Sequence, residues 1–189
     1  MTSTARRYFE EMYEGDADPW GFETSAYERR KYALTMASLP NEHYGSVFEP
    51  GCSIGVLTEL LATRCDRLLA TDLIPSVLER ARVRLEHYPQ VVLSPLAIPG
   101  SWPKGRFDLV VLSEIAYYFD ATTLERVIER TLESTGPGAH VVGVHWRGQT
   151  NYPLSGDGAH EIIGSCSALT RLVHHVETDF ILEVWERQH

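Results

Sequence analysis

Cysteine is scarce in this chain of 189 residues, and long apolar runs are missing. Cys52, Cys65 and Cys166 show neither paired spacing nor the spacing of a zinc site, which argues against a disulfide framework and predicts three reduced thiols. No apolar stretch approaches the roughly 18 residues that a membrane-spanning helix needs. We therefore expect no membrane partner.

Basic residues are also in short supply. The chain has 17 lysines and arginines against 26 acidic residues, and its formal net charge is −9. A nucleic acid held mainly by phosphate contacts needs the opposite balance, so none is expected as a partner. The first residues, MTSTARRYFEEMYEGD, lack the apolar segment of a secretory signal, and we expect a cytoplasmic protein.

From residue 46 onward, short apolar runs alternate with helix-length amphipathic segments, which predicts an α/β fold. Strands are expected at 47–49, 67–73, 90–93, 107–113 and 140–146, with two more inside 169–185. Helices are expected at 55–63, 76–86, 122–134 and 155–164, the third closed by Gly136-Pro137-Gly138. Single helices between strands favour parallel pairing, whereas the short link between the last two strands requires antiparallel pairing. The prediction is a doubly wound, mostly parallel seven-stranded Rossmann-like sheet with an antiparallel C-terminal strand pair.

Residues 1–40 are rich in aromatic side chains and contain no strand pattern. The segment 14–21 is full of turn-forming residues, and 27–39 has helical periodicity. We interpret this part as two helices joined by a loop, forming a helical lid. The chain is then a single domain over 1–189, with a cap at 1–40 and a core at 41–189, and Trp20 is expected to close over a ligand.

The segment after the first expected strand carries the strongest chemical signal. It reads Glu49-Pro-Gly51-Cys-Ser-Ile-Gly55, and Asp72 follows at the tip of the second expected strand. Asp72 is placed to bind ribose hydroxyls, but the G-x-G-x-x-G pattern of dinucleotide sites and the Lys-Ser/Thr of a P-loop are both missing. This combination suits a nucleoside without a pyrophosphate, above all S-adenosyl-L-methionine.

At this point the chain resembles the class I S-adenosylmethionine-dependent methyltransferases, whose motifs match 49–55, 71–73, 107–114 and 136–139. A closer resemblance is to the nodulation-protein-S family of N-methyltransferases. It is carried by Phe9-x-x-x-Tyr13, Asp18-Pro-Trp20, Tyr27-Glu-Arg-Arg-Lys31 and the segment 113–119. The resemblance implies methyl transfer from S-adenosylmethionine to the amine of an amino sugar or another small molecule, leaving S-adenosylhomocysteine.

The cofactor residues follow from the motif and from this resemblance. They are Trp20, Arg30, Glu49, Gly51, Gly55, Asp72, Leu73, Leu96 and Ser113. Arg30 is expected to pair with the cofactor carboxylate or with Glu49. The acid that many relatives place after the third strand is absent, since the segment reads Ser94-Pro-Leu96-Ala-Ile98. Adenine is then expected to contact Leu96 and backbone groups.

The acceptor side is predicted from residues that follow the later strands. His145 is the predicted general base, with Glu114 or His160 as the alternative. Tyr117, Tyr118, Trp146 and Asp157 are expected to line the acceptor pocket, and no metal site is expected. Two other functions stay open: a small-molecule O-methyltransferase, and a non-catalytic S-adenosylmethionine-binding partner protein. The chain is expected to be a monomer or a homodimer.

Overall fold

A computed structural model describes residues 3–189, and residues 1 and 2 of the expected cap lie outside the described part. In chain order the elements are α1 (Ser3–Gly15), α2 (Ala26–Ser38), β1 (Val47–Pro50), α3 (Val56–Ala62), β2 (Leu68–Asp72), α4 (Pro75–Arg84), β3 (Val91–Pro95), β4 (Phe107–Ser113), η1 (Ala116–Tyr118), α5 (Ala121–Ser134), β5 (Thr135–Trp146), α6 (Gly156–Gly164), β6 (Leu169–Val176) and β7 (Phe180–Arg187). Their sequence confirms the alternation of strands and helices expected after residue 46.

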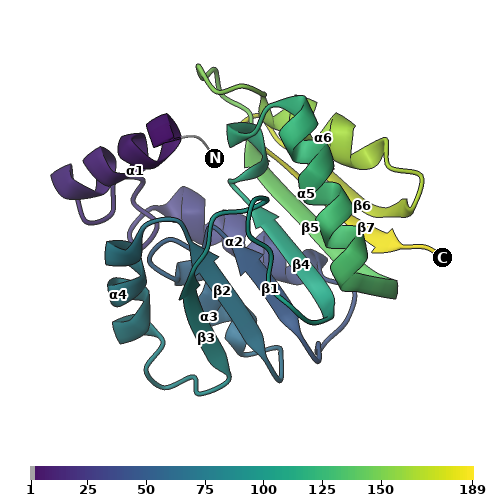
Figure 1. Cartoon of the computed structure of the whole chain (residues 1–189), viewed down its shortest axis with the longest axis horizontal. Coiled ribbons are helices and arrows are strands. Elements are labelled where there is room, and N and C mark those ends of the chain that lie inside the picture. The colour runs from purple at the N-terminus through teal and green to yellow at the C-terminus, as the bar shows by residue number, and fades with distance from the viewer. Residues whose placement is uncertain (1–2) are drawn as a thin grey trace.

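Within residues 3–189, seven strands form one sheet in the order β3-β2-β1-β4-β5-β7-β6 (Figure 1). Pairs among β1 to β5 are parallel, and β7 pairs antiparallel with both β5 and β6. This confirms the predicted doubly wound sheet with an antiparallel C-terminal pair. The chain runs outward to β3 and then returns to β4 beside β1, so the strand order reverses between these two strands.

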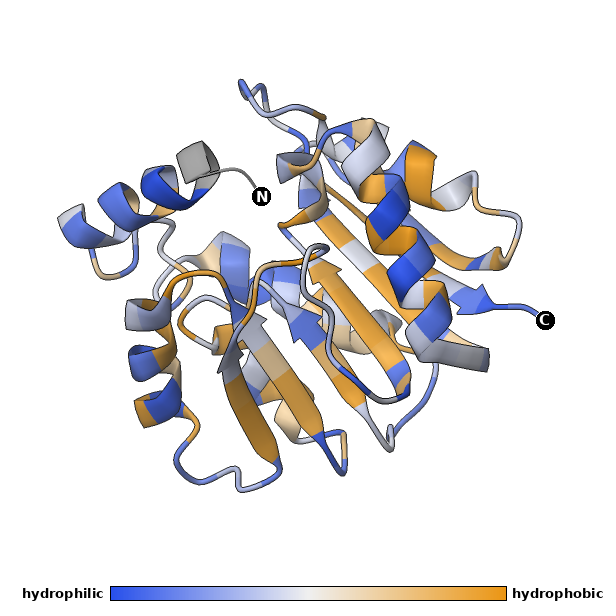
Figure 2. Ribbon diagram, viewed as in Figure 1, coloured by the Kyte–Doolittle hydropathy of each residue, from blue (hydrophilic) through white to orange (hydrophobic). Residues whose placement is uncertain are grey.

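The sheet separates two apolar cores because successive residues of a strand point to opposite faces. One face of β4, β5 and β7, including Val142 and Val144, packs against α2 and α3. The other face, including Val141 and Trp185, packs against α5 and α6. Figure 2 shows largely hydrophobic strands in the middle of the molecule and hydrophilic residues on the outer sides of α4 and α5. Strand alternation therefore decides which helices each side chain of β5 meets.

The start of β5 differs from the prediction. The strand begins at Thr135, immediately after α5, rather than at His140. Thr135 pairs in parallel with Phe107, the first residue of β4, and the register shifts before Leu109. Because sheet pairing begins at once, Gly136-Pro137-Gly138 lies inside the strand instead of closing the preceding helix.

The helices of the N-terminal part agree with the expectation of two helices and a loop. Ser25 caps α2, and its hydroxyl accepts the N–H of Glu28 at 3.4 Å. The loop between α1 and α2 is folded around Asp18, whose carboxylate accepts the N–H groups of Phe22 and Glu23 at 2.8 and 2.9 Å. Over residues 3–189, the helices are all too short or too polar to cross a bilayer.

Candidate active site

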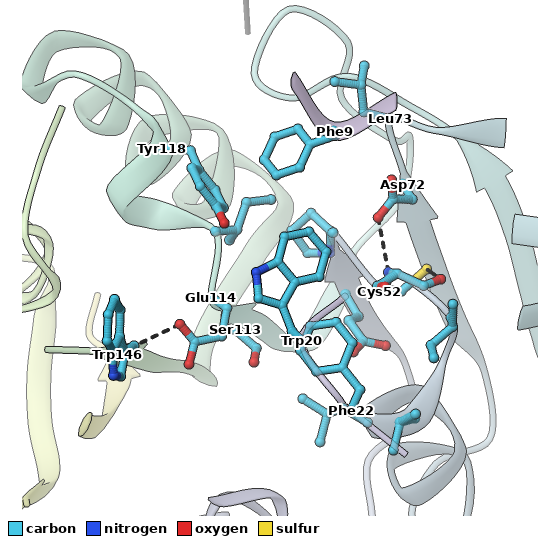
Figure 3. A pocket seen from close by; sticks show the side chains of 18 of the residues that line it. Phe9, Trp20, Phe22, Cys52, Asp72, Leu73, Ser113, Glu114, Tyr118 and Trp146 are labelled. Carbon is cyan, nitrogen blue, oxygen red and sulfur yellow. Dashed lines mark hydrogen bonds between the residues drawn. The ribbon is translucent and has the colours of Figure 1, made fainter. Parts of the chain in front are cut away.

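A cavity of about 370 Å³ lies at the carboxyl ends of the parallel strands. The ends of β1, β2 and β4 and the loops after them form its floor, and residues of α1, α2 and their connecting loop cover it (Figure 3). Its volume lies within the range of about 300–1,000 Å³ that is usual for small-molecule sites. Its position between β1 and β4 is also the point at which doubly wound sheets bind ligands.

Asp72, the last residue of β2, is held in place by backbone groups. One carboxylate oxygen accepts the N–H of Ser53 at 3.0 Å, and the other accepts the N–H of Ile74 at 2.9 Å. Burial raises the pKa of Asp72, and these hydrogen bonds oppose that rise. Each oxygen keeps a lone pair, so the fixed carboxylate can accept hydrogen bonds from two neighbouring hydroxyl groups.

The loop after β1 lies close to the turn after β4. Gly51 has a φ of +76°, and a Cβ there would lie 2.9 Å from Cδ1 of Ile115. Its N–H donates to the Thr71 carbonyl at 2.6 Å, which ties the loop to the end of β2. A side chain at this position would meet both strain and a clash, so glycine keeps the cavity floor open.

Glu49 lies on this floor and is 2% exposed. Among the described residues, its Oε2 has no hydrogen-bond partner. Burial, together with the negative charge of Asp72, raises the pKa of Glu49 to about 8. A buried carboxyl group without a partner is stabilised in its ionised form by a nearby cation. The floor therefore suits a positively charged ligand group.

A second acidic group lies on the opposite side of the cavity, at Glu114. Its Oε1 accepts a hydrogen bond from Nζ of Lys31 at 2.6 Å. Its Oε2 accepts the hydroxyl of Tyr117 at 2.6 Å and the N–H of Trp146 at 3.0 Å. Figure 3 shows the Glu114 side chain beside Trp146, at the far side from Asp72. One lone pair of Oε1 remains for a ligand.

Lys31 joins two carboxylates at the cavity wall. Its Nζ lies 2.9 Å from Glu28 and 2.6 Å from Glu114, and its side chain is 2% exposed. The ammonium also lies 5.0 Å from the ring centre of Tyr27, a favourable cation–π distance. Two carboxylates and one ammonium leave this part of the wall with a net negative charge when all three are ionised. Such a wall favours a cationic ligand.

Aromatic side chains from the cap close the cavity. The hydroxyl of Tyr13 forms a hydrogen bond with Oγ of Ser53, on the loop after β1. The ring centre of Trp20 lies 5.3 Å from that of Tyr13, and Figure 3 shows the indole between the Asp72 side and the Glu114 side. Phe9 meets Tyr118 edge to face at 4.9 Å. Cap and core therefore make direct contact across the cavity mouth.

Most residues predicted from the sequence lie together on the wall of this cavity. They are Trp20, Glu49, Gly51, Asp72, Leu73, Leu96, Ser113, Glu114, Tyr117, Tyr118 and Trp146. The cofactor and acceptor sets thus converge on one space, although their parts of the chain are far apart in sequence.

The structure corrects the predicted placement of His145 and His160. His145 is fully buried on the face of the sheet that packs against α5 and α6, away from the cavity wall. Its Nε2 accepts the N–H of Ala116 at 3.0 Å, and its Nδ1 lies 2.9 Å from Nε2 of His160. Neither ring has a free nitrogen directed at the cavity, so neither fits the role of general base.

Three other predicted residues also lie off the cavity wall. The guanidinium of Arg30 forms two hydrogen bonds with Glu177, at 2.6 and 2.7 Å, rather than facing Glu49. Asp157 pairs with Arg147 at 3.0 Å. Gly55 caps α3 behind the loop and packs against α4. These residues support the surroundings of the site, and direct ligand contact is not part of their geometry.

Sequence reasoning missed several residues that line the cavity. Lys31 and Glu28 were not selected, although an acid and a lysine three residues apart in a predicted helix are a detectable pair. Tyr152, which stacks on Tyr117 at 5.1 Å, gave no signal because it lies in an irregular loop.

The three cysteines are unpaired, as expected, and burial raises the pKa of Cys52 well above its usual value.

Comparison with known proteins places this geometry in a family. The family model of nodulation protein S (NodS) matches residues 8–137. The chain belongs to the NodS family. Nodulation protein S of Bradyrhizobium diazoefficiens is 32% identical over 122 residues, which are 64% of this chain and 58% of that protein. Nodulation protein S of Rhizobium tropici is 29% identical over 127 residues, which are 66% of this chain and 53% of that protein. The NodS match thus spans little more than half of these curated relatives.

Solved structures share the fold of this chain. A protein from Pseudomonas syringae, described as a putative methyltransferase, is 42% identical with a TM-score of 0.75, covering 86% of this chain and all of that one. The N-methyltransferase NodS from Bradyrhizobium japonicum, in complex with S-adenosylhomocysteine, has a TM-score of 0.84. It is 24% identical, covers 97% of this chain and 98% of that one, and so shows a common fold.

The NodS match ends within β5, at residue 137. The glycine loop, Asp72 and Glu114 lie inside the matched part, whereas Trp146, Tyr152 and the buried histidines lie beyond it. The predicted family is confirmed by these findings, and the cavity wall draws on residues from both parts.

Proposed function

We propose that this NodS-family chain is an S-adenosylmethionine-dependent methyltransferase acting on the amine of a small molecule or amino sugar. The observation that carries the proposal is the single cavity with Asp72 at one end and the Lys31–Glu114 pair at the other. The structural similarity to the N-methyltransferase NodS, solved in complex with S-adenosylhomocysteine, supports it.

The residues of the cavity fit this cofactor. Asp72 offers two fixed carboxylate oxygens for ribose hydroxyls, and Glu49 holds an unpartnered buried oxygen that suits a cationic group. The apolar side chain of Leu96 and the ring of Trp20 offer surfaces for adenine or for the methionyl chain. When bound, S-adenosylmethionine would supply a methyl group on a positively charged sulfur.

The chain's own residues are suited to present an acceptor amine. Glu114 keeps one lone pair on Oε1, which can accept an N–H of the acceptor and fix its orientation. Its alternative role, predicted from the sequence, is to take up the proton of that amine. Lys31 and the hydroxyl of Tyr117 hold the carboxylate still. The apolar rings of the cap lower the local dielectric around the cavity, which strengthens these charge interactions.

An amine is favoured over a hydroxyl acceptor by charge. Glu28 and Glu114 share one ammonium, so the ionised wall attracts a cation. An ammonium can give its proton to a carboxylate such as Glu114, whereas the far less acidic hydroxyl of an acceptor needs a stronger base, and the described cavity wall presents carboxylates but no histidine. This difference carries the proposal of N-methylation.

The first test is a calorimetric titration with S-adenosylmethionine and S-adenosylhomocysteine. We expect micromolar binding to the wild type and at least a tenfold loss in the Asp72→Asn variant, because one charged acceptor is removed. Asp66→Ala is the matched control, since Asp66 precedes the same strand and is exposed at its other end. Absence of binding to the wild type would refute the proposed cofactor.

Turnover then tests the acceptor. A fully deacetylated glucosamine oligosaccharide is offered beside its N-acetylated counterpart, and methyl transfer is followed by mass spectrometry. We expect methylation of the free amine alone. Methylation of the N-acetylated sugar, or of hydroxyl groups, would contradict N-methylation and favour an O-methyltransferase.

A further inference from the structure

The end of β5 holds the turn that carries part of the cavity wall. Glu114 has a φ of +52°, in the left-handed region where a side chain causes strain. Its N–H donates to the Val144 carbonyl at 2.9 Å, and its carboxylate accepts the Trp146 N–H at 3.0 Å. Between these two β5 residues, Nε2 of His145 accepts the N–H of Ala116 at 3.0 Å. Three consecutive residues of β5 thus hold the turn.

Behind His145, a line of buried hydrogen bonds leads away from the cavity. Nδ1 of His145 lies 2.9 Å from Nε2 of His160, and Nδ1 of His160 lies 2.8 Å from Oε2 of Glu183. The three residues are at most 3% exposed. The buried Oε1 of Glu183 accepts hydrogen bonds from Arg171 at 2.7 Å and His174 at 2.5 Å, and these two half-exposed side chains connect the line to the surface.

The direction of these hydrogen bonds follows from one backbone group. The N–H of Ala116 can only donate, so Nε2 of His145 carries no proton and its proton is on Nδ1. That proton is donated to Nε2 of His160, whose own proton must then be on Nδ1, facing Glu183. Both rings are neutral and share one tautomer. A proton on Nε2 of His145 would set two donors against each other.

The packing of α6 on β5 makes this line possible. Gly156 is the first residue of α6, and a Cβ there would lie 2.4 Å from the carbonyl oxygen of Trp146. His160 follows four residues later on the same face of the helix. Gly143 leaves room for its ring, since a Cβ there would lie 3.2 Å from Cε1 of His160. Two positions without side chains therefore allow the histidine rings to meet.

We propose that His145, His160 and Glu183 act as positioning residues, which fix the turn from Glu114 to Tyr118 through the N–H of Ala116. The inference rests on the proposed function, since this turn carries the carboxylate that orients the acceptor. Replacing the line by apolar residues would leave the Ala116 N–H without an acceptor at a strained turn. His145 thus acts through Glu114 and not on the substrate.

The charged groups around His145 favour its neutral form. Burial lowers the pKa of His145 well below its usual value, and the neighbouring His160 and Lys31 act in the same direction. Glu114 and Tyr117 lie on the turn above it, and Glu183 stands behind His160. The hydrogen bonds from His160, His174 and Arg171 hold the pKa of Glu183 below its usual value despite burial. A stable acceptor for the Ala116 N–H is the result.

The first test needs no turnover. Imidazole ¹⁵N spectra of the whole wild-type chain are expected to show His145 and His160 as neutral rings, each with its proton on Nδ1. Hydrogen exchange of the Ala116 amide is measured in two variants. His145→Gln places an oxygen near the position of Nε2, whereas His145→Asn reaches only the position of Nδ1. We expect exchange to rise about tenfold in His145→Asn and by less than threefold in His145→Gln.

The second test measures catalysis with the deacetylated oligosaccharide. His145→Asn should lower kcat about tenfold or more with little change in KM or in the Kd of S-adenosylhomocysteine, and His145→Gln should restore most of the loss. Equal losses in both variants, or a proton on Nε2 in the wild type, would overturn the proposal. If His145→Asn fails to fold, the same comparison is made at His160, where His160→Gln keeps an acceptor near the position of Nε2 and His160→Asn does not. If the proposed function is wrong, the wild type shows no turnover, but the spectra and the exchange rates of the Ala116 amide still test the hydrogen-bonded line.

Discussion

At the scale of single residues, Glu49 makes the stability of the folded chain depend on pH. Its pKa is raised to about 8 by burial, far above that of an unfolded chain. Between the unfolded and folded pKa values the folded protein binds more protons, so the stability contribution of this residue falls as pH rises. We expect the free energy of unfolding to decrease from pH 5 to pH 8, with Glu49 contributing at most about 1.4 kcal/mol per pH unit.

Urea unfolding at several pH values checks this expectation, with Glu49→Gln as the control. Glutamine has the shape of the protonated acid and cannot titrate, so the variant should show a flatter dependence. Parallel curves for the two proteins would show that Glu49 is ionised in the folded chain. The unfolding free energy of both proteins should still depend on pH to some extent, because burial also raises the pKa values of Asp72 and Glu28.

At the scale of elements, α6 begins in close contact with the end of β5. Because a Cβ at Gly156 would lie 2.4 Å from a backbone oxygen, Gly156→Ala must move the helix start. We expect a loss of about 1–3 kcal/mol in unfolding free energy, typical of overpacking. Gly164→Ala, at the other end of α6, meets its nearest atom at 3.7 Å and should be neutral or slightly stabilising. Equal effects of the two substitutions on thermal or urea unfolding would contradict this reading.

At the scale of the whole molecule, the N-terminal cap contacts both the cavity and the C-terminal strand pair. Trp20 lies in the cavity mouth, and Arg30 of α2 pairs with Glu177 in the turn between β6 and β7. We expect S-adenosylhomocysteine to change the tryptophan fluorescence, and Trp20→Ala to weaken its binding about tenfold. Trp20→Phe keeps an aromatic ring and should keep most of the affinity. A fluorescence change that persists in Trp20→Phe would assign the signal to another tryptophan.

The fold was predictable because its signals are local. Each signal is contained in a short segment of the sequence: the apolar strands, the single helices between them, the glycines after β1 and the helical periodicity of α2. The position of Asp72 followed from its place at the end of a strand. Element order alone was therefore enough to bring most of the predicted cofactor residues to one cavity, with Arg30 and Gly55 as the exceptions.

The side to which His145 points could not be predicted in the same way. It depends on the alternation within β5 and on which helix covers each face, and α6 reaches His145 only because Gly156 allows close contact. The partner of Lys31 is 83 residues away, so the ion pair with Glu114 exists only in the folded chain. Side-chain chemistry that joins distant segments needed the three-dimensional structure.

The loop from Arg147 to Ser155 connects β5 to α6 without being part of either, yet its Tyr152 lies on the cavity wall. No strand pairing of the sheet depends on this loop, and it lies beyond the part of the chain that the family model matches. The loop can therefore be exchanged without altering the sheet or the Asp72 end of the cavity. Replacing it with the corresponding loop of a relative is expected to reshape only the side of the cavity that Tyr152 lines.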